Sequence, residues 1–163
     1  TAKTAGNYAA ALYPALECQK EGFHQLIWTD GKEHKYIEES GTMNILFMIN
    51  GVLVTPAEDT DTILRGTTKR AVLEVAKDWG IKVEERKVTV DEVIEGVKNG
   101  AITEVFGAGT AATIAHIVMI GYRGEKYDLP SVEGRDFSNK VKTYLDDLKA
   151  GKIEDTKKWC VTV

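Results

Sequence analysis

Residues 44–49 constrain the fold most strongly, because apolar side chains occupy nearly every position instead of alternating with polar ones. A strand with this pattern is buried on both faces, so the sheet that contains it must be covered on both sides. The Asn50-Gly51 pair that follows is typical of a two-residue hairpin turn, and residues 52–55 form the predicted returning strand. The sequence therefore predicts a mixed α/β fold around one central strand.

The remaining elements are predicted from the spacing of apolar residues and from turn and cap signals. Thr67 or Thr68 is the predicted N-cap of a helix that Gly80 ends, and Thr89 with Glu92 has the spacing of a capping box. Further helices are predicted over 6–20, with Tyr8, Leu12, Ala15 and Leu16 inward and a break at Pro14, over 90–98, and from Asp136 onward. Other strands are predicted at 24–28, 35–38, 81–88, 102–106, 112–120 and 126–129, with neighbouring strands forming antiparallel hairpins.

Composition excludes several classes of protein. The 163 residues are 43% hydrophobic and 28% charged, with a net charge of −4 and no basic block, which argues for a globular domain and against a nucleic-acid partner. The longest apolar runs are too short to span a bilayer. Two distant cysteines and three scattered histidines form no metal-ligand pattern, and a reduced, cytoplasmic setting is the simplest expectation. No linker divides residues 1–163, so one domain is expected, and the abrupt start without Met suggests a fragment.

Four short stretches carry residues suited to cofactor chemistry. Lys3 lies in a small-residue loop, where it is either a solvated charge or an amine that condenses with a carbonyl. The second stretch, 39–44, reads Glu-Ser-Gly-Thr-Met-Asn. The third, 64–68, reads Leu-Arg-Gly-Thr-Thr and offers the free N–H groups of a helix start, either to a phosphate or merely to a cap. The fourth, 106–111, reads Phe-Gly-Ala-Gly-Thr-Ala, and its small residues either admit a ligand or form a plain turn.

In this order, the four stretches resemble the class IV, D-amino-acid-aminotransferase-like pyridoxal-phosphate enzymes, and most closely the branched-chain-amino-acid aminotransferases. The resemblance extends over essentially all 163 residues, in the order of that family's larger, C-terminal domain. It implies an α/β pseudo-barrel of mixed, largely antiparallel strands with outer helices. It also implies that a smaller N-terminal domain, which precedes the lysine in that family, is absent from this chain.

The same resemblance implies a role for each candidate residue. Lys3 would form the Schiff base with pyridoxal 5′-phosphate and move the proton between the substrate α-carbon and the cofactor. Tyr8 would face the cofactor's O3′, and Glu39 would hold the pyridine nitrogen protonated. The other implied contacts are Thr42 steadying Glu39 and Tyr8, Leu64 packing on the ring, Thr67, Thr68 and Thr110 holding the phosphate, and Thr110 with Ala111 facing the substrate carboxylate.

Three departures from the family pattern stand out. Arg65 replaces a proline and points into solvent or toward the phosphate, and Thr67 replaces a valine-like residue. Ala112 and Ala115 occupy the positions of a redox cysteine pair found in some animal members, so no thiol switch is expected.

The resemblance implies transamination of leucine, isoleucine and valine with 2-oxoglutarate, by a ping-pong cycle in a homodimer, in branched-chain amino-acid biosynthesis. A D-amino-acid aminotransferase or an aminodeoxychorismate lyase of the same fold is the nearest alternative. A non-catalytic remnant domain, which folds without holding cofactor, is another. No metal is expected, and these 163 residues alone are expected to transaminate poorly, because one wall of the pocket would be missing.

Overall fold

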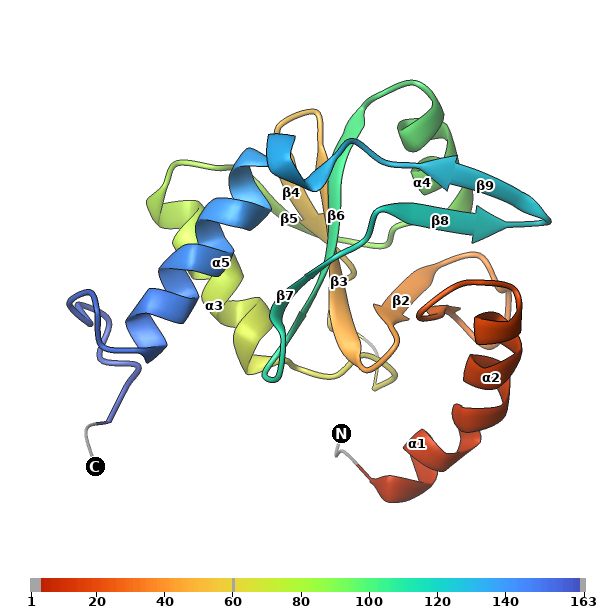
Figure 1. Cartoon of the computed structure of the whole chain (residues 1–163), viewed down its shortest axis with the longest axis horizontal. Coiled ribbons are helices and arrows are strands. Elements are labelled where there is room, and N and C mark those ends of the chain that lie inside the picture. Colours follow the sequence, from red (N-terminus) through yellow and green to blue (C-terminus); the bar gives the residue numbers. More distant parts are fainter. Residues whose placement is uncertain (1–3, 60, 162–163) are drawn as a thin grey trace.

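The structure, a computed structural model, describes residues 4–59 and 61–161. In this part of the chain the strands form one sheet of seven strands and one of two (Figure 1). The larger sheet contains β1 (Ile27–Thr29), β2 (Ile37–Ser40), β3 (Met43–Ile49), β4 (Val52–Thr55), β5 (Val83–Glu85), β6 (Ile102–Gly109) and β7 (Thr113–His116). The smaller sheet pairs β8 (Met119–Tyr122) with β9 (Glu125–Asp128). The helices are α1 (Ala5–Ala10), α2 (Leu12–Lys20), α3 (Thr67–Asp78), α4 (Val90–Lys98), α5 (Asp136–Lys149) and a single 3-10 turn at Val132–Gly134.

Strand β3 is the centre of the larger sheet. It pairs with β6 along one edge, while β2 pairs with its start and β4 with its end on the other edge. Every described pairing is antiparallel except that of β4 with β5. The prediction of mixed, largely antiparallel strands with helices outside them is therefore confirmed.

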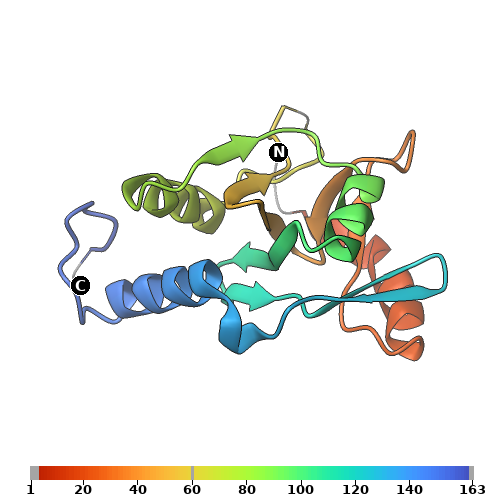
Figure 2. The same ribbon diagram turned by 90° about the horizontal axis from the view of Figure 1, so that it is seen from above.

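Both faces of β3 are buried, as the apolar run predicts. Leu46 and Met48 pack into one hydrophobic cluster with α3 and α5. Ile45 and Phe47 pack into a second cluster with α4 and the two-stranded sheet. Figure 2 shows the helices α3 and α5 lying next to each other, with α4 well apart from them. The hairpin prediction is also confirmed, because Asn50 and Gly51 both have positive φ, 49° and 77°.

Several element boundaries differ from the prediction. The N-cap of α3 is Gly66, not Thr67 or Thr68, whereas Thr89 caps α4 as predicted and accepts a 3.0 Å bond from the Glu92 N–H. The single strand predicted at 112–120 is two strands that belong to different sheets. The strand predicted at 81–88 is ordered as a ladder only over β5.

The predicted inward face of the first helix is wrong for the residues described. The segment breaks at Ala11 into α1 and α2, with Pro14 in the first turn of α2. No residue of α2 is buried, and the side chains of Leu12 and Leu16 are 65% and 56% exposed.

Candidate functional site

Three turns meet at one end of the larger sheet, the lower end in Figure 1. They are the β2–β3 turn, the start of α3 and the β6–β7 turn. Strand register brings the first and third together, because Asn44 is paired with Glu39 on one side and with Ala108 on the other. A 2.8 Å hydrogen bond from Asn44 Nδ2 to the Leu64 carbonyl brings in the start of α3. Segments far apart in the sequence therefore form one site around a buried asparagine.

The Glu39 carboxylate is fixed in place by this arrangement. Its Oε1 accepts hydrogen bonds from the Leu64 N–H at 3.0 Å and from Asn44 Nδ2 at 3.3 Å. The neighbouring Glu38 points elsewhere, and its Oε1 accepts a 2.7 Å bond from the Thr62 hydroxyl. The two adjacent carboxylates thus diverge, as strand alternation predicts.

Gly66 allows the backbone to approach Asn44 very closely. A Cβ atom at position 66 would lie 1.9 Å from Asn44 Oδ1 and 3.2 Å from Asn44 Cγ. Any larger residue must displace the asparagine that holds Glu39 and Leu64. Neither Asn44 nor Gly66 was among the predicted site residues; a polar residue at the start of an otherwise apolar buried strand was the available signal for Asn44.

The start of α3 presents unpaired backbone N–H groups. Gly66 supplies no capping side chain, and the first turn contains no acidic residue. The Thr67 side chain is exposed and Thr68 is half-buried. Such a helix end combines free N–H donors with the positive end of the helix dipole, an arrangement that favours an anion.

Lys69, also in the first turn of α3, is almost fully buried, with 1% of its side chain exposed. Its Nζ lies 2.8 Å from Glu58 Oε1 and 3.3 Å from Glu85 Oε2, and it donates to the Pro56 carbonyl at 3.3 Å. It thereby ties the helix start to the loop after β4 and to β5.

The β6–β7 turn is exposed and lined by small residues. Thr110, Ala111 and Ala112 are all exposed, and no backbone hydrogen bond described outside the helices and strands uses their N–H groups. Gly107 and Gly109 pack on Met43, and a Cβ atom at either position would come within 2.8 Å of its side chain. The glycines therefore let β6 lie close beside the β2–β3 turn.

The remaining predicted residues are less closely tied to this site. Lys3 lies outside the described residues. Tyr8 is on α1, with 36% of it exposed. Thr42 is exposed, and its side chain makes no hydrogen bond described among residues 4–59 and 61–161. The carbonyl of Gly41, in the same turn, accepts a 3.0 Å bond from Trp28 Nε1, which steadies the turn.

Behind the β6–β7 turn lies a buried polar network. The guanidinium of Arg135, with 2% exposed, donates to the carbonyls of Val105, Ile117 and Pro130. Glu104 accepts from the first free N–H groups of α5, those of Phe137 and Ser138. Burial, helped by the charge of Arg135, lowers the pKa of His116 below its ordinary value.

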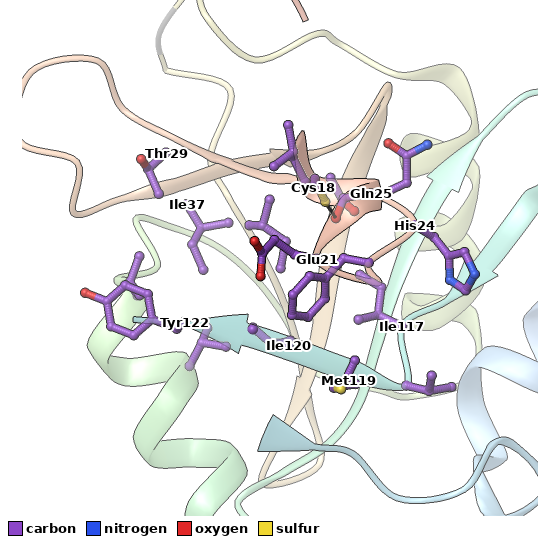
Figure 3. A pocket seen from close by; sticks show the side chains of 18 of the residues that line it. Cys18, Glu21, His24, Gln25, Thr29, Ile37, Ile117, Met119, Ile120 and Tyr122 are labelled. Carbon is purple, nitrogen blue, oxygen red and sulfur yellow. Dashed lines mark hydrogen bonds between the residues drawn. The ribbon is translucent and has the colours of Figure 1, made fainter. Parts of the chain in front are cut away.

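The largest described cavity lies on the other face of the sheet (Figure 3). Its volume is about 710 Å³, and its walls come from the segment after α2, from β8 and from α4. Ser40 and Met43 line it, whereas Glu39 and Asn44, their neighbours along the strands, belong to the opposite face. None of the predicted site residues lines this cavity.

Two kinds of feature are absent from the described residues. No group of His, Cys, Asp and Glu side chains in residues 4–59 and 61–161 could hold a metal ion. No helix among these residues is long and apolar enough to cross a membrane.

The sequence matches a known family model, that of amino-transferase class IV, over residues 1–120. A probable branched-chain-amino-acid aminotransferase of Staphylococcus aureus (strain N315) is 41% identical over 99% of this chain and 45% of that protein. Branched-chain-amino-acid aminotransferase 2 of Bacillus subtilis (strain 168) is 40% identical over 99% of this chain and 44% of that protein. The chain therefore spans less than half the length of these curated relatives.

Solved structures with the same fold lead to the same group. A branched-chain aminotransferase from the archaeon Thermoproteus uzoniensis, solved with norvaline, superposes with a TM-score of 0.79 at 28% identity, over 97% of this chain and 48% of that one. A bacterial branched-chain amino acid aminotransferase solved with pyridoxamine 5′-phosphate gives a TM-score of 0.77 at 25% identity, over 97% of this chain and 47% of that one.

Proposed function

The chain belongs to the amino-transferase class IV family, and from this premise we propose that it is the cofactor-binding part of a pyridoxal-phosphate-dependent aminotransferase acting on branched-chain L-amino acids. The observation that carries the proposal is the meeting of three turns around Asn44. These turns bring a fixed carboxylate, an uncapped helix start and a turn of small residues to one end of the sheet.

The described residues are suited to pyridoxal phosphate in three respects. Glu39 is anchored by two donors, so its carboxylate keeps a constant position for a ring nitrogen. The start of α3, with Thr67 and Thr68, offers N–H groups and a positive dipole to a phosphate. Gly66 leaves no Cβ in the space where the helix start meets Asn44, so the turn can be tight.

When bound, pyridoxal phosphate would supply a ring that withdraws electrons from the substrate α-carbon. Glu39 would hold a proton on the ring nitrogen, which strengthens that withdrawal. The amine of Lys3 would form the covalent link and move a proton at the α-carbon, while Leu64 would pack on the ring and Tyr8 would face O3′. Thr67, Thr68 and Thr110 would bind the phosphate, and the amides of Thr110 and Ala111 the substrate carboxylate.

Substrates and partners follow from the relatives. Proteins named branched-chain aminotransferases match almost the whole chain, so leucine, isoleucine and valine are the proposed amino donors and 2-oxoglutarate the acceptor. The region that these relatives have and this chain lacks would supply the rest of the substrate pocket, and a homodimer is the proposed assembly. A reducing, cytoplasmic setting agrees with the free thiols of Cys18 and Cys160.

The first test is covalent capture of the cofactor. Pyridoxal phosphate added to the chain should produce a visible absorbance band, and borohydride should then fix the cofactor to the protein. Lys3→Ala should abolish this covalent attachment, since no other amine is proposed to form the link. Lys20→Ala, which removes an exposed lysine of α2, is the matched control and should leave attachment unchanged. Fixation to the Lys3→Ala protein would rule out the assignment.

A further inference from the structure

Thr113, the residue that ends the β6–β7 turn, has an unfavourable backbone conformation. Its φ is +56°, in the left-handed region that glycine and asparagine favour. A β-branched residue there is a genuine outlier, because its Cβ substituents crowd the backbone. The residue is also buried, with 4% exposed. Such a conformation persists only where surrounding contacts hold it.

The contacts that hold Thr113 come from α5. The Thr113 hydroxyl donates to Asp146 Oδ1 at 2.7 Å and accepts a hydrogen bond from Lys149 Nζ. Asp146 Oδ2 in turn accepts a 2.6 Å bond from Lys142. The bonds from Lys142 and Thr113 lower the pKa of Asp146, so the carboxylate remains charged and the bond to Thr113 is charge-assisted.

This contact acts directly on the turn. Thr113 is paired with Gly109 across the sheet, and the three residues between them are exposed. The conformation of Thr113 therefore sets the direction in which the chain leaves the turn, and so the orientation of the turn's amides. Among the described residues, the Thr113 side chain is the link from this turn to the helix layer by a side-chain hydrogen bond.

We propose that Thr113 and Asp146 are positioning residues, which hold the β6–β7 turn in the one shape that binds the cofactor phosphate and the substrate carboxylate. The inference rests on the proposed function, because it assumes that Thr110 and Ala111 of this turn contact those anions. Neither Thr113 nor Asp146 touches the ligand in this scheme. They act through the backbone of residues 110–112.

The test uses variants that separate the hydroxyl from the shape of the side chain. Thr113→Val keeps the branched shape and removes the hydroxyl, whereas Thr113→Ser keeps the hydroxyl. Asp146→Asn removes the charge of the acceptor. Asp147→Asn is the matched control, because Asp147 lies next in the same helix and pairs with Lys152 at 3.1 Å instead.

Two quantities are measured for each protein. Amide hydrogen exchange of segment 107–113 in the cofactor-free chain reports the shape of the turn, and absorbance titration with pyridoxal phosphate gives the dissociation constant. Thr113→Val and Asp146→Asn should speed exchange in this segment alone and weaken cofactor binding about tenfold, the effect of losing one charge-assisted hydrogen bond. Thr113→Ser should restore affinity to within about twofold of the unchanged chain, and Asp147→Asn should alter neither quantity.

Each other outcome contradicts a specific part of the scheme. Unchanged exchange in 107–113, or faster exchange throughout the chain, would mean that the pair does not position the turn. Local loosening with unchanged affinity would mean that the shape of the turn does not serve the cofactor. If the unchanged chain binds no cofactor, the proposed function fails instead, and the exchange data still decide whether the pair holds the turn.

Discussion

At the scale of single residues, the site depends on how closely two backbones approach at position 66. The Asn44 amide lies where a Cβ of residue 66 would be, and the same amide holds both Leu64 and Glu39. The need for glycine here arises from contact with a strand more than 20 residues earlier. It does not arise from backbone dihedral angles, because Gly66 has φ −71° and ψ 128°, which any residue can adopt.

Gly66→Ala is therefore expected to displace Asn44 and weaken both the fold and the site. The overlap should cost about 1–3 kcal/mol in the free energy of unfolding, as overpacking of a tight contact does. Urea unfolding measures this cost, and cofactor titration should show a weaker dissociation constant. Gly134→Ala is the control, because a Cβ there meets nothing within 4 Å. Equal stability of the two variants would show that the close approach is not a constraint.

Glu39 illustrates what could be predicted at this scale and what could not. Alternation along the strand separates Glu39 from Glu38, so the divergence of the two carboxylates follows from the sequence. The partners of Glu39 do not follow from it, because Leu64 is 25 residues away and its N–H is placed by the path of the loop. Asn44 belonged to the recognised motif, but its role as the link between three segments is visible only in three dimensions.

At the scale of elements, α3 is fixed at its start by a charge buried under the helix. Lys69 connects the first turn of α3 to the loop after β4 and to β5. A buried ammonium of this kind is stabilising only while its carboxylate partners are present, and the reverse also holds. The position of the helix start, and so of the proposed phosphate site, depends on that group.

Lys69→Met should lower the free energy of unfolding by roughly 2–4 kcal/mol, because it leaves the mostly buried carboxylate of Glu58 without its cation. Chemical denaturation gives the value. Arg70→Met, which removes an exposed charge from the next position, should change stability by less than about 0.5 kcal/mol. A loss for Lys69→Met as small as that for Arg70→Met would indicate that the ion pairs contribute little.

Elements with local signals were predicted well, and elements defined by distant contacts were not. The Asn50-Gly51 hairpin and the Thr89 cap each depend on residues within a few positions. The stretch 112–120 has no glycine or proline to mark a break. It divides because the Ile117 N–H bonds to Val105 of β6, while Val118 accepts from Leu129 next to β9. The two halves therefore join different sheets for reasons that no local pattern contains.

At the scale of the whole molecule, one strand links the two hydrophobic clusters. Leu46 and Phe47 are neighbours in β3 and fully buried in opposite clusters. Loss of β3 would open both clusters at once, so they are expected to unfold as one cooperative unit. The predicted α/β arrangement is correct at this scale because a two-sided apolar strand requires covering layers on both faces.

Two tryptophans allow this cooperativity to be measured. Trp79 packs against the cluster beneath α3 and α5, and Trp28 lies in β1 at the edge of the other half of the sheet. Fluorescence of variants that retain one of these tryptophans, with the other and Trp159 replaced by Phe, should give the same urea midpoint after correction for each variant's stability by circular dichroism. Midpoints that still differ would show two independently stable halves.

The helix pair α1–α2 is the part of the molecule where sequence and structure agree least. Its apolar spacing predicted burial, yet Leu12, Tyr13 and Leu16 are exposed in this chain. Apolar spacing identifies a face that can be buried, but it does not identify what covers that face.

The meeting of three turns around Asn44 also bears on how the protein reaches its native state. Glu39 and Leu64 are 25 positions apart, and Thr113 and Asp146 are 33 apart, so each closure spans a long loop and must wait for the sheet between them. During refolding, secondary structure should therefore return before the ability to capture a ligand does. A chain stalled part of the way would have helices and strands and still be blind to its cofactor.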